Sequence, residues 1–215
     1  MTTLAEFRTA IRDRLGVPSD DGLFDDTTLT RLVNRAIKKV ESENDWAWLE
    51  KSETITTVAS TRSYSVASDY VRTMLLVDGE FKPLRQVTID EAEWWGNVTT
   101  GRPAAYAQSG RTVVMVPTPD GSYDFTHRYI GSETTLSGDT DEPLAPEPWH
   151  ESIIEYAVFL SYRRANNSPE AAATLDSYKE LIKTMIGRAD EQADSRGGGV
   201  VPKAAAPATP PAPGA

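Results

Sequence analysis

The chain has 215 residues, with 22 basic and 32 acidic side chains and a formal net charge of −10. This length predicts one large domain or two small ones, and the hydrophobic fraction of 39% is typical of a folded globular protein. The sequence contains no cysteine and only two histidines, which excludes disulfides, thiol nucleophiles, cysteine-bound metals and a histidine-rich metal centre.

Two amphipathic helices are predicted over residues 1–50. The first starts with a capping box formed by Thr3 and Glu6, and its apolar residues recur at steps of three and four: Leu4, Phe7, Ile11 and Leu15. The second runs from about residue 25 to about residue 45 and has one apolar and one polar face, as expected of a helix that packs on one side.

From about residue 53 the apolar period changes from 3.6 to 2. Short β-branched runs separated by turn sequences predict six or seven strands over residues 51–135, as in an antiparallel sandwich or meander. The Asp78-Gly79 dipeptide predicts a two-residue hairpin whose return strand covers residues 81–87.

Four tryptophans are expected to be structural anchors. Trp46 and Trp48 lie between the second helix and the first strand, so we expect them to lock the helical and β regions together. Trp94 and Trp95 lie in a short helix predicted over residues 88–95, and we expect them to be buried against the sheet or to form an interface.

Helical periodicity returns after an acidic, proline-rich connector at residues 139–148. Two further helices are predicted, one from about Pro148 and a longer one from Ser168. We expect the connector and these helices, residues 136–194, to pack on the first two helices. The predicted fold class is therefore α+β: a helical bundle formed by the N- and C-terminal helices, with an inserted antiparallel β-sandwich or meander and an extended C-terminal tail.

Residues 195–215 are rich in glycine, alanine and proline and are predicted to form this tail. A proline-rich segment loses little conformational entropy when it docks on a partner, so the few large or charged side chains of the tail are suited to partner contacts. The expected contact residues are Trp149 of the connector region and, in the tail, Arg196, Val200, Val201, Pro202 and Lys203.

The acidic composition disfavours nucleic-acid binding, and no run of about 18 apolar residues predicts a membrane span. The basic residues Arg35, Lys38 and Lys39 have helical spacing and are interpreted as a solvated helix face. His127 lies in an alternating strand and is expected to be a half-exposed sheet residue, whereas His150 is expected to face solvent or a neighbouring subunit.

The sequence contains none of the common nucleophile, nucleotide-binding or zinc-protease motifs. Glu91 and Glu93, beside two tryptophans, are the best candidates for the paired acids of a wall-cleaving glycosidase, although an acidic protein produces such neighbours by chance. Asp139, Asp141 and Glu142 resemble part of a calcium loop that lacks its glycine and its final glutamate. We therefore predict no catalytic residue, no cofactor and no metal site.

A series of short motifs follows in order along residues 25–190: Trp46-Ala47-Trp48-Leu49, Thr57-Val58-Ala59-Ser60, Tyr64-Ser65-Val66-Ala67-Ser68-Asp69-Tyr70-Val71-Arg72, Asp78-Gly79, Thr100-Gly101-Arg102-Pro103, Pro117-Thr118-Pro119-Asp120-Gly121-Ser122-Tyr123, Asp139-Thr140-Asp141-Glu142-Pro143-Leu144-Ala145-Pro146 and Trp149-His150-Glu151. Each motif alone is ordinary, but the ordered series resembles the head–tail adaptor (connector, or head-completion) proteins of tailed bacteriophages. One departure is Ala67, at a position where the resemblance leads us to expect proline.

The resemblance implies a structural protein and not an enzyme. Such adaptors form rings, usually of twelve subunits, that lie beneath the portal, extend the DNA channel and provide the attachment surface for the tail. The implied partners are the portal protein, further copies of this chain and a tail, stopper or nozzle protein. Packaged DNA would pass through the lumen without sequence-specific binding. The implied location is the neck of the virion, and the host cytoplasm during assembly.

Two alternatives stay open at this point. One is a tail or baseplate binding module that uses the β domain with Trp94 and Trp95. The other is a muralytic enzyme that cleaves the cell wall.

Overall fold

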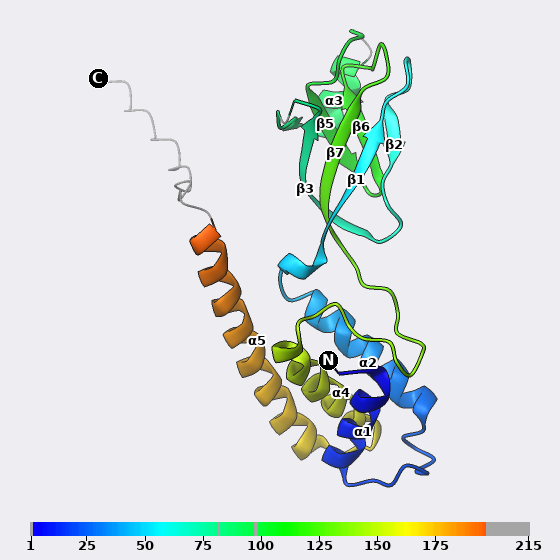
Figure 1. Ribbon diagram of the computed structural model, residues 1–215, viewed down its shortest axis with the longest axis vertical. Coiled ribbons are helices and arrows are strands. Elements are labelled where there is room, and N and C mark those ends of the chain that lie inside the picture. The colour runs from blue at the N-terminus through cyan, green and yellow to red at the C-terminus, as the bar shows by residue number, and fades with distance from the viewer. Residues whose placement is uncertain (1, 81, 97–98, 197–215) are drawn as a thin grey trace, which may run out of the picture.

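The computed structural model describes residues 2–80, 82–96 and 99–196. It is elongated, with a helical bundle at one end and a β unit at the other (Figure 1). Both terminal regions of the sequence contribute helices to the bundle, and the strands lie between them in the chain. The predicted α+β class, with terminal helices and an inserted β region, is confirmed.

Four helices form the bundle: α1 (Leu4–Leu15), α2 (Asp26–Glu41), α4 (His150–Arg164) and α5 (Ser168–Arg196). The predicted capping box of α1 is present, since the Thr3 side chain accepts from the Glu6 N–H and the Glu6 carboxylate accepts from the Thr3 N–H. Gly16 ends α1 with a φ of 67°, a left-handed conformation that glycine adopts without strain. The Asp25 carboxylate caps α2.

The apolar stripes of these helices face one another and form one continuous core. α4 lies at its centre, because it packs against α1, α2 and α5. Helix residues that are at most 1% exposed include Leu4, Phe7, Ile11, Leu29, Val33, Ala36, Ile153, Ala157 and Met185. The burial of these side chains is what holds the two ends of the sequence together.

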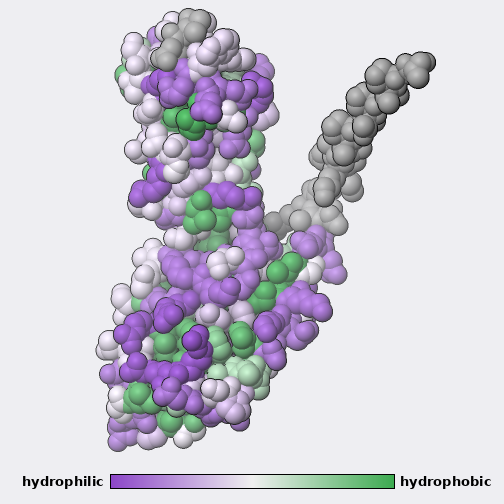
Figure 2. Space-filling view, turned by 180° about the vertical axis from the view of Figure 1, so that it is seen from behind, coloured by the Kyte–Doolittle hydropathy of each residue, from purple (hydrophilic) through white to green (hydrophobic). Residues whose placement is uncertain are grey.

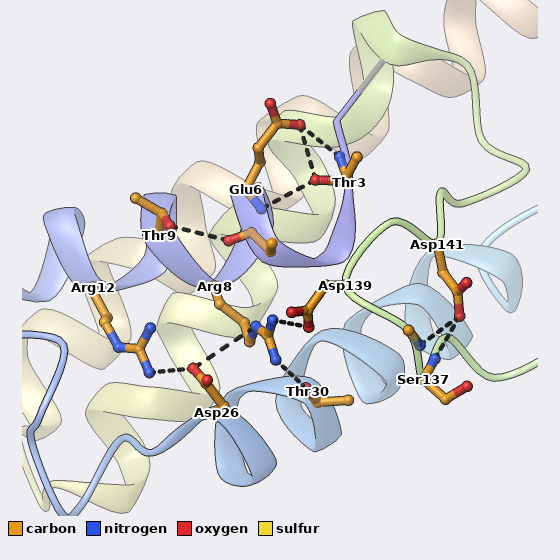
Figure 3. A network of polar contacts seen from close by, with 12 residues as sticks. Thr3, Glu6, Arg8, Thr9, Arg12, Asp26, Thr30, Ser137, Asp139 and Asp141 are labelled. Carbon is orange, nitrogen blue, oxygen red and sulfur yellow. Dashed lines mark hydrogen bonds and ion pairs between the residues drawn. The ribbon is translucent and has the colours of Figure 1, made fainter.

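Arg8 links α1 to α2 and to the acidic connector, as Figure 3 shows. Its guanidinium pairs with Asp139 of the connector and, at 3.8 Å, with Asp26 of α2. The backbone N–H of Leu4 donates to the carbonyl oxygen of Asp141 at 2.8 Å. The connector is therefore fastened to the first turns of α1.

The β unit contains two sheets. The first has the order β1-β7-β3, all antiparallel, and the second has the order β2-β6-β5-β4. The strands are β1 (Glu50–Thr56), β2 (Ser63–Ser65), β3 (Tyr70–Asp78), β4 (Arg85–Gln86), β5 (Ala105–Ser109), β6 (Thr112–Val116) and β7 (Asp124–Gly131), and the short helix α3 (Ile89–Gly96) packs against β5 and β6. Between the sheets lies a second core, whose fully buried members are Leu76, Val113, Met115 and Phe125.

The chain after β3 reverses as predicted, but the turn is longer than two residues, because Val77 lies opposite Pro83. The predicted return strand over residues 81–87 is shortened to residues 82–84, where the N–H of Asp78 donates to the carbonyl oxygen of Lys82 and the N–H of Leu84 donates to that of Leu76. The Asp78 carboxylate accepts the backbone N–H of Lys82, and Pro83, which has no N–H, forms only an isolated bridge with Val77. The chain then crosses to the other sheet, where β4 pairs in parallel with β5. The hairpin signal therefore identifies the reversal of the chain correctly, but neither the length of the turn nor the length of the return strand.

Helix α5 is longer than the sequence predicts, because it extends to Arg196. Ser195 and Arg196 belong to its last turn and not to the tail. Between Gly187 and Arg196 the sequence contains no further glycine and no proline. No residue of this stretch therefore favours an earlier end of the helix. The four expected tail contacts at residues 200–203 lie outside the described residues.

Candidate functional site

Two of the predicted anchors lie at the junction between the bundle and the β unit, where the 3₁₀ turn η1 (Ala47–Leu49) connects α2 to β1. Trp46 is 1% exposed, and its indole Nε1 donates to the carbonyl oxygen of Val40 in α2 at 2.7 Å. Its ring stacks on that of Trp48, with centroids 4.6 Å apart and 12° between the planes. Because Trp48 is only half-buried, the pair presents apolar surface beside the junction.

A cavity of about 730 Å³ lies against this pair. We call it the junction cavity and define it by Trp46, Trp48, Glu50, Pro148, Trp149 and Arg188. Arg188 of α5 lies over the ring of Trp149 at 5.3 Å, a cation–π contact. Glu50 is exposed, and its carboxylate has no hydrogen-bond or ion-pair partner among the residues that the structure describes. The cavity combines aromatic walls with two acidic groups, Glu50 and Asp45, of which Asp45 pairs with Arg72, and with the basic Arg188. Such a lining suits the binding of a protein segment.

Trp94 and Trp95 lie on α3, in the β unit and away from the bundle (Figure 1), and are 71% and 45% exposed. The expectation that they are buried against the sheet is wrong, and the interface alternative stays a prediction. The reason is the helical period: Ala92 is the fully buried residue of α3, and Trp94, two positions on, therefore points away from the sheet. Arg85 lies over the ring of Trp95 at 5.6 Å.

Glu91 and Glu93 do not form a glycosidase pair. Glu91 caps α3 by accepting the N–H of Thr88 at 3.2 Å, and Glu93 pairs with Arg62 at 3.2 Å. A glycosidase places its general acid in an apolar pocket, whereas both of these carboxylates are exposed. The geometry therefore offers no support for wall cleavage at this position.

His127 is 0% exposed, so the prediction of a half-exposed residue is wrong. It lies on β7, the central strand of its sheet, and its side chain faces inward. Its Nδ1 donates to Glu53 Oε1 at 2.9 Å, and its Nε2 lies 2.9 Å from the hydroxyl of Thr73. That hydroxyl also lies 3.2 Å from Tyr70 Oη and from Gln108 Oε1 of the opposite sheet.

This order of hydroxyl, imidazole and carboxylate is that of a hydrolase triad. Here, however, the imidazole of His127 has no exposed surface, and the Thr73 hydroxyl is engaged by two further groups. We therefore assign the network a structural role, because it satisfies a buried imidazole and links the two sheets.

His150 is 5% exposed, which contradicts the prediction that it faces solvent or a neighbouring subunit. Its Nε2 donates to the carbonyl oxygen of Ala145 at 2.8 Å, and its ring packs on that of Phe7 with centroids 5.3 Å apart. The connector folds over the start of α4 and covers the ring, which the helical pattern alone does not show.

Four exposed arginines form a surface that the sequence analysis missed, and we call it the arginine face. Arg31 and Arg35 of α2 and Arg163 and Arg164 of α4 line one depression of about 420 Å³. None of them has a carboxylate within 4 Å among the described residues. On a chain of net charge −10, such a group suits an acidic partner surface. The sequence shows that Arg31 and Arg35 share one face of α2. That this face lies beside the arginines of α4 depends on tertiary packing.

The neighbouring lysines are neutralised locally. Lys38 pairs with Glu41 at 3.1 Å and Lys39 pairs with Glu43 at 2.8 Å, both on the surface of α2. Of the three basic residues interpreted as a solvated helix face, only Arg35 contributes an uncompensated charge.

The acids of the connector have structural partners. Asp139 pairs with Arg8, and the Asp141 carboxylate accepts the N–H groups of Ser137 and Gly138, each at 2.8 Å (Figure 3). Within the described ranges, no three acidic or histidine side chains are grouped in a way that could hold a metal ion. No helix in those ranges has the length and apolar content needed to cross a bilayer.

Glu133 is a buried acid at the point where the chain leaves the β unit. It is 7% exposed, and its Oε1 accepts the backbone N–H of Leu144 at 2.8 Å. Burial raises the pKa of Glu133 to about 7.

In the parent protein, the free energy of unfolding should fall as the pH rises, and replacing Glu133 by glutamine should remove this fall. The folded-state pKa lies above the ordinary value of 4.5, so the folded state binds the extra proton. The tighter binding of this proton in the folded state contributes fully to the free energy of unfolding below about pH 4.5. The contribution is lost as the pH rises through about 7. Glutamine keeps the oxygen that Leu144 uses, so E133Q should exceed the parent in unfolding free energy by on the order of 1–3 kcal/mol at about pH 8 and by little at about pH 4.

Urea unfolding at both pH values checks this prediction. Glu142→Gln is the matched control, because Glu142 is an exposed acid of the connector and its loss should not change the pH profile. An identical profile for the parent, E133Q and E142Q would show that burial of Glu133 has no such effect.

A comparison with protein families now adds to the geometry. A family model described as "SU10 adaptor protein" matches residues 2–203, and the match includes both the bundle and the β unit. No curated protein matches the chain.

Proposed function

The chain belongs to the SU10 adaptor protein family, a family of phage head–tail adaptors, and on that premise we propose that it forms a ring beneath the portal of a tailed bacteriophage. In this proposal twelve copies extend the DNA channel and offer the attachment surface for the next tail component, a stopper or nozzle protein. The observation that carries the proposal is the family match over residues 2–203, since it covers the bundle and the β unit together.

The charge distribution supports a role as a channel that does not grip DNA. A net charge of −10 per copy repels phosphate, so a duplex could slide through a ring of such subunits. The positive charge of the arginine face lies on the bundle instead. We propose that the bundle contacts the portal and neighbouring copies and that the β unit faces the tail.

Electron cryo-microscopy of the particle neck tests the proposal. The expected result is a closed ring of this chain directly below the portal, with the bundle toward the portal. Density for this chain at the tail tip, or in a single copy, would contradict it.

The isolated protein is expected to be monomeric or weakly associated and to form the ring only on a portal. On the face in Figure 2, apolar residues occur as separate patches between hydrophilic ones, so this face has no large apolar surface that requires permanent burial. Light scattering of the pure protein, alone and with portal, checks this expectation. A stable closed ring in the absence of portal would refute ordered assembly.

Deletion of residues 197–215 is expected to leave the melting temperature nearly unchanged and to weaken docking in the assembly. The deleted segment follows the last described turn of α5, and the cores described above are built from residues that precede it. Calorimetry and co-sedimentation with portal measure the two effects separately. Normal portal binding and particle yield after the deletion would show that the tail has no role in docking.

A second candidate function is a tail or baseplate binding module, and the exposure of Trp94 and Trp95 favours it. Exposed aromatic rings are common anchors for sugar or protein ligands. The copy number of the chain in purified particles and its position relative to the portal distinguish the two functions. Zymography separates both from a muralytic enzyme.

A further inference from the structure

We propose that the junction cavity binds the proline-rich C-terminal segment, residues 200–213, of a second copy of the chain. The inference rests on the proposed function, because a ring supplies each cavity with a neighbouring copy. In this arrangement the C-terminal segment of one copy and the junction cavity of the next join adjacent copies of the ring.

The walls of the junction cavity have the chemistry of a polyproline-binding groove. Grooves that bind extended proline-rich segments are lined with aromatic rings, on which proline rings pack. Here Trp48, which is supported from behind by the buried Trp46, and the indole of Trp149 provide aromatic surface in one cavity of about 730 Å³. A cavity of this size holds a few residues of an extended chain and not a folded element.

The C-terminal segment has the matching pattern. Pro207, Pro210 and Pro213 recur every three residues, and a polyproline II helix has three residues per turn. In that conformation the three prolines lie on one face, about 9 Å apart along the axis. They can therefore contact successive aromatic surfaces without bending the segment.

The charges of the segment and of the cavity are also complementary. Lys203 is the only charged side chain in residues 197–215, and Glu50 offers an exposed carboxylate at the cavity without a partner among the described residues. Arg188 is already stacked on Trp149, so it adds to the aromatic wall while keeping its charge at the surface.

The path of the chain favours a second copy over the same copy. Arg188 lies eight residues before Arg196, so the helix ends about 12 Å beyond the cavity. To return to its own cavity, the segment would have to reverse and run back along α5. The segment of a second copy needs no reversal, and each copy has one cavity and one segment, as required for a head-to-tail contact that closes into a ring.

Calorimetric titration of a synthetic peptide of residues 200–213 into the protein lacking residues 197–215 tests the binding. The expected result is one peptide per chain. Trp48→Ala should weaken the affinity at least tenfold, and Glu50→Lys should weaken it up to about fivefold, the range of an exposed ion pair. A peptide with alanine at 207, 210 and 213 should bind at least tenfold more weakly.

Two matched controls should leave the affinity unchanged: Trp94→Ala, which removes an exposed indole on the β unit, and Glu142→Lys, which makes the same charge change in the connector. Thermal melting verifies that W48A is folded, and E50K and the altered peptide do not depend on that variant. Absence of binding at millimolar peptide, or equal binding by W48A, E50K and both controls, would overturn the proposal.

The source of the segment is tested by titrating the same peptide into the full-length chain at low micromolar concentration. Docking between copies predicts the same Kd as for the shortened protein. Docking within one chain predicts a loss of at least tenfold, because the tethered segment competes at a high effective concentration. That loss would overturn the assignment to a second copy. None of these titrations uses portal, so their failure is distinct from failure of the ring proposal.

Discussion

Replacing Trp46 by alanine is expected to lower the free energy of unfolding by about 3–5 kcal/mol. The indole is 1% exposed, so its removal leaves a large cavity. It also removes the shorter of two hydrogen bonds that the carbonyl oxygen of Val40 accepts, at 2.7 Å from Trp46 and 3.2 Å from the N–H of Glu43. Because Trp46 lies where the bundle meets the β unit, the loss should affect the attachment of the two as well as local packing.

Urea unfolding of three tryptophan variants checks this prediction. Trp94→Ala removes the same side chain from a site that is 71% exposed and should cost less than about 0.5 kcal/mol. Trp48→Ala removes the half-buried member of the stack and should lie between the two. Equal unfolding free energies for W46A and W94A would show that Trp46 is not an anchor.

Replacing His127 by alanine is expected to cost roughly 2–4 kcal/mol. The imidazole is 0% exposed, and its loss leaves a cavity between the sheets. It also removes one of two hydrogen-bond partners of Glu53, the other being the N–H of Ala67, and one contact of the Thr73 hydroxyl. A broken buried network costs more than its hydrogen bonds contribute when intact.

The matched control is Arg128→Ala, at the next position of β7, whose side chain is exposed on the outer face. This change should alter the unfolding free energy by less than about 0.5 kcal/mol. Thermal or urea unfolding followed by near-ultraviolet circular dichroism measures both variants. A cost for H127A no larger than that for R128A would contradict the structural role of the network.

Much of the fold could be predicted because local chemistry decides it. The Thr3 and Glu6 capping box, the glycine at position 16 and the apolar stripe of α2 each act within a few residues, and each element appears as predicted. The change of apolar period near residue 53 likewise falls within the first strand of the β unit, Glu50–Thr56, since the period reports which face is buried.

The errors concern residues whose environment is set by distant parts of the chain. His127 alternates like a residue of a half-buried strand, but its strand is central and its inner face is covered by the second sheet. His150 is covered by the connector. The arginine face depends on how α2 packs against α4. The periodicity of apolar residues within one element carries no information about its contacts with distant elements.

The register of β1 with β7 has a consequence for how this architecture could have arisen. Glu50 pairs directly with Ile130, so the chain enters and leaves the β unit at adjacent points, about 5 Å apart between Cα atoms. An insertion with neighbouring ends leaves the path of the host unchanged whatever its size. The four helices can therefore serve as a constant support on which β units of different length could be exchanged by recombination at two neighbouring junctions. Each exchange would alter the exposed end of the molecule without changing the packing of the bundle.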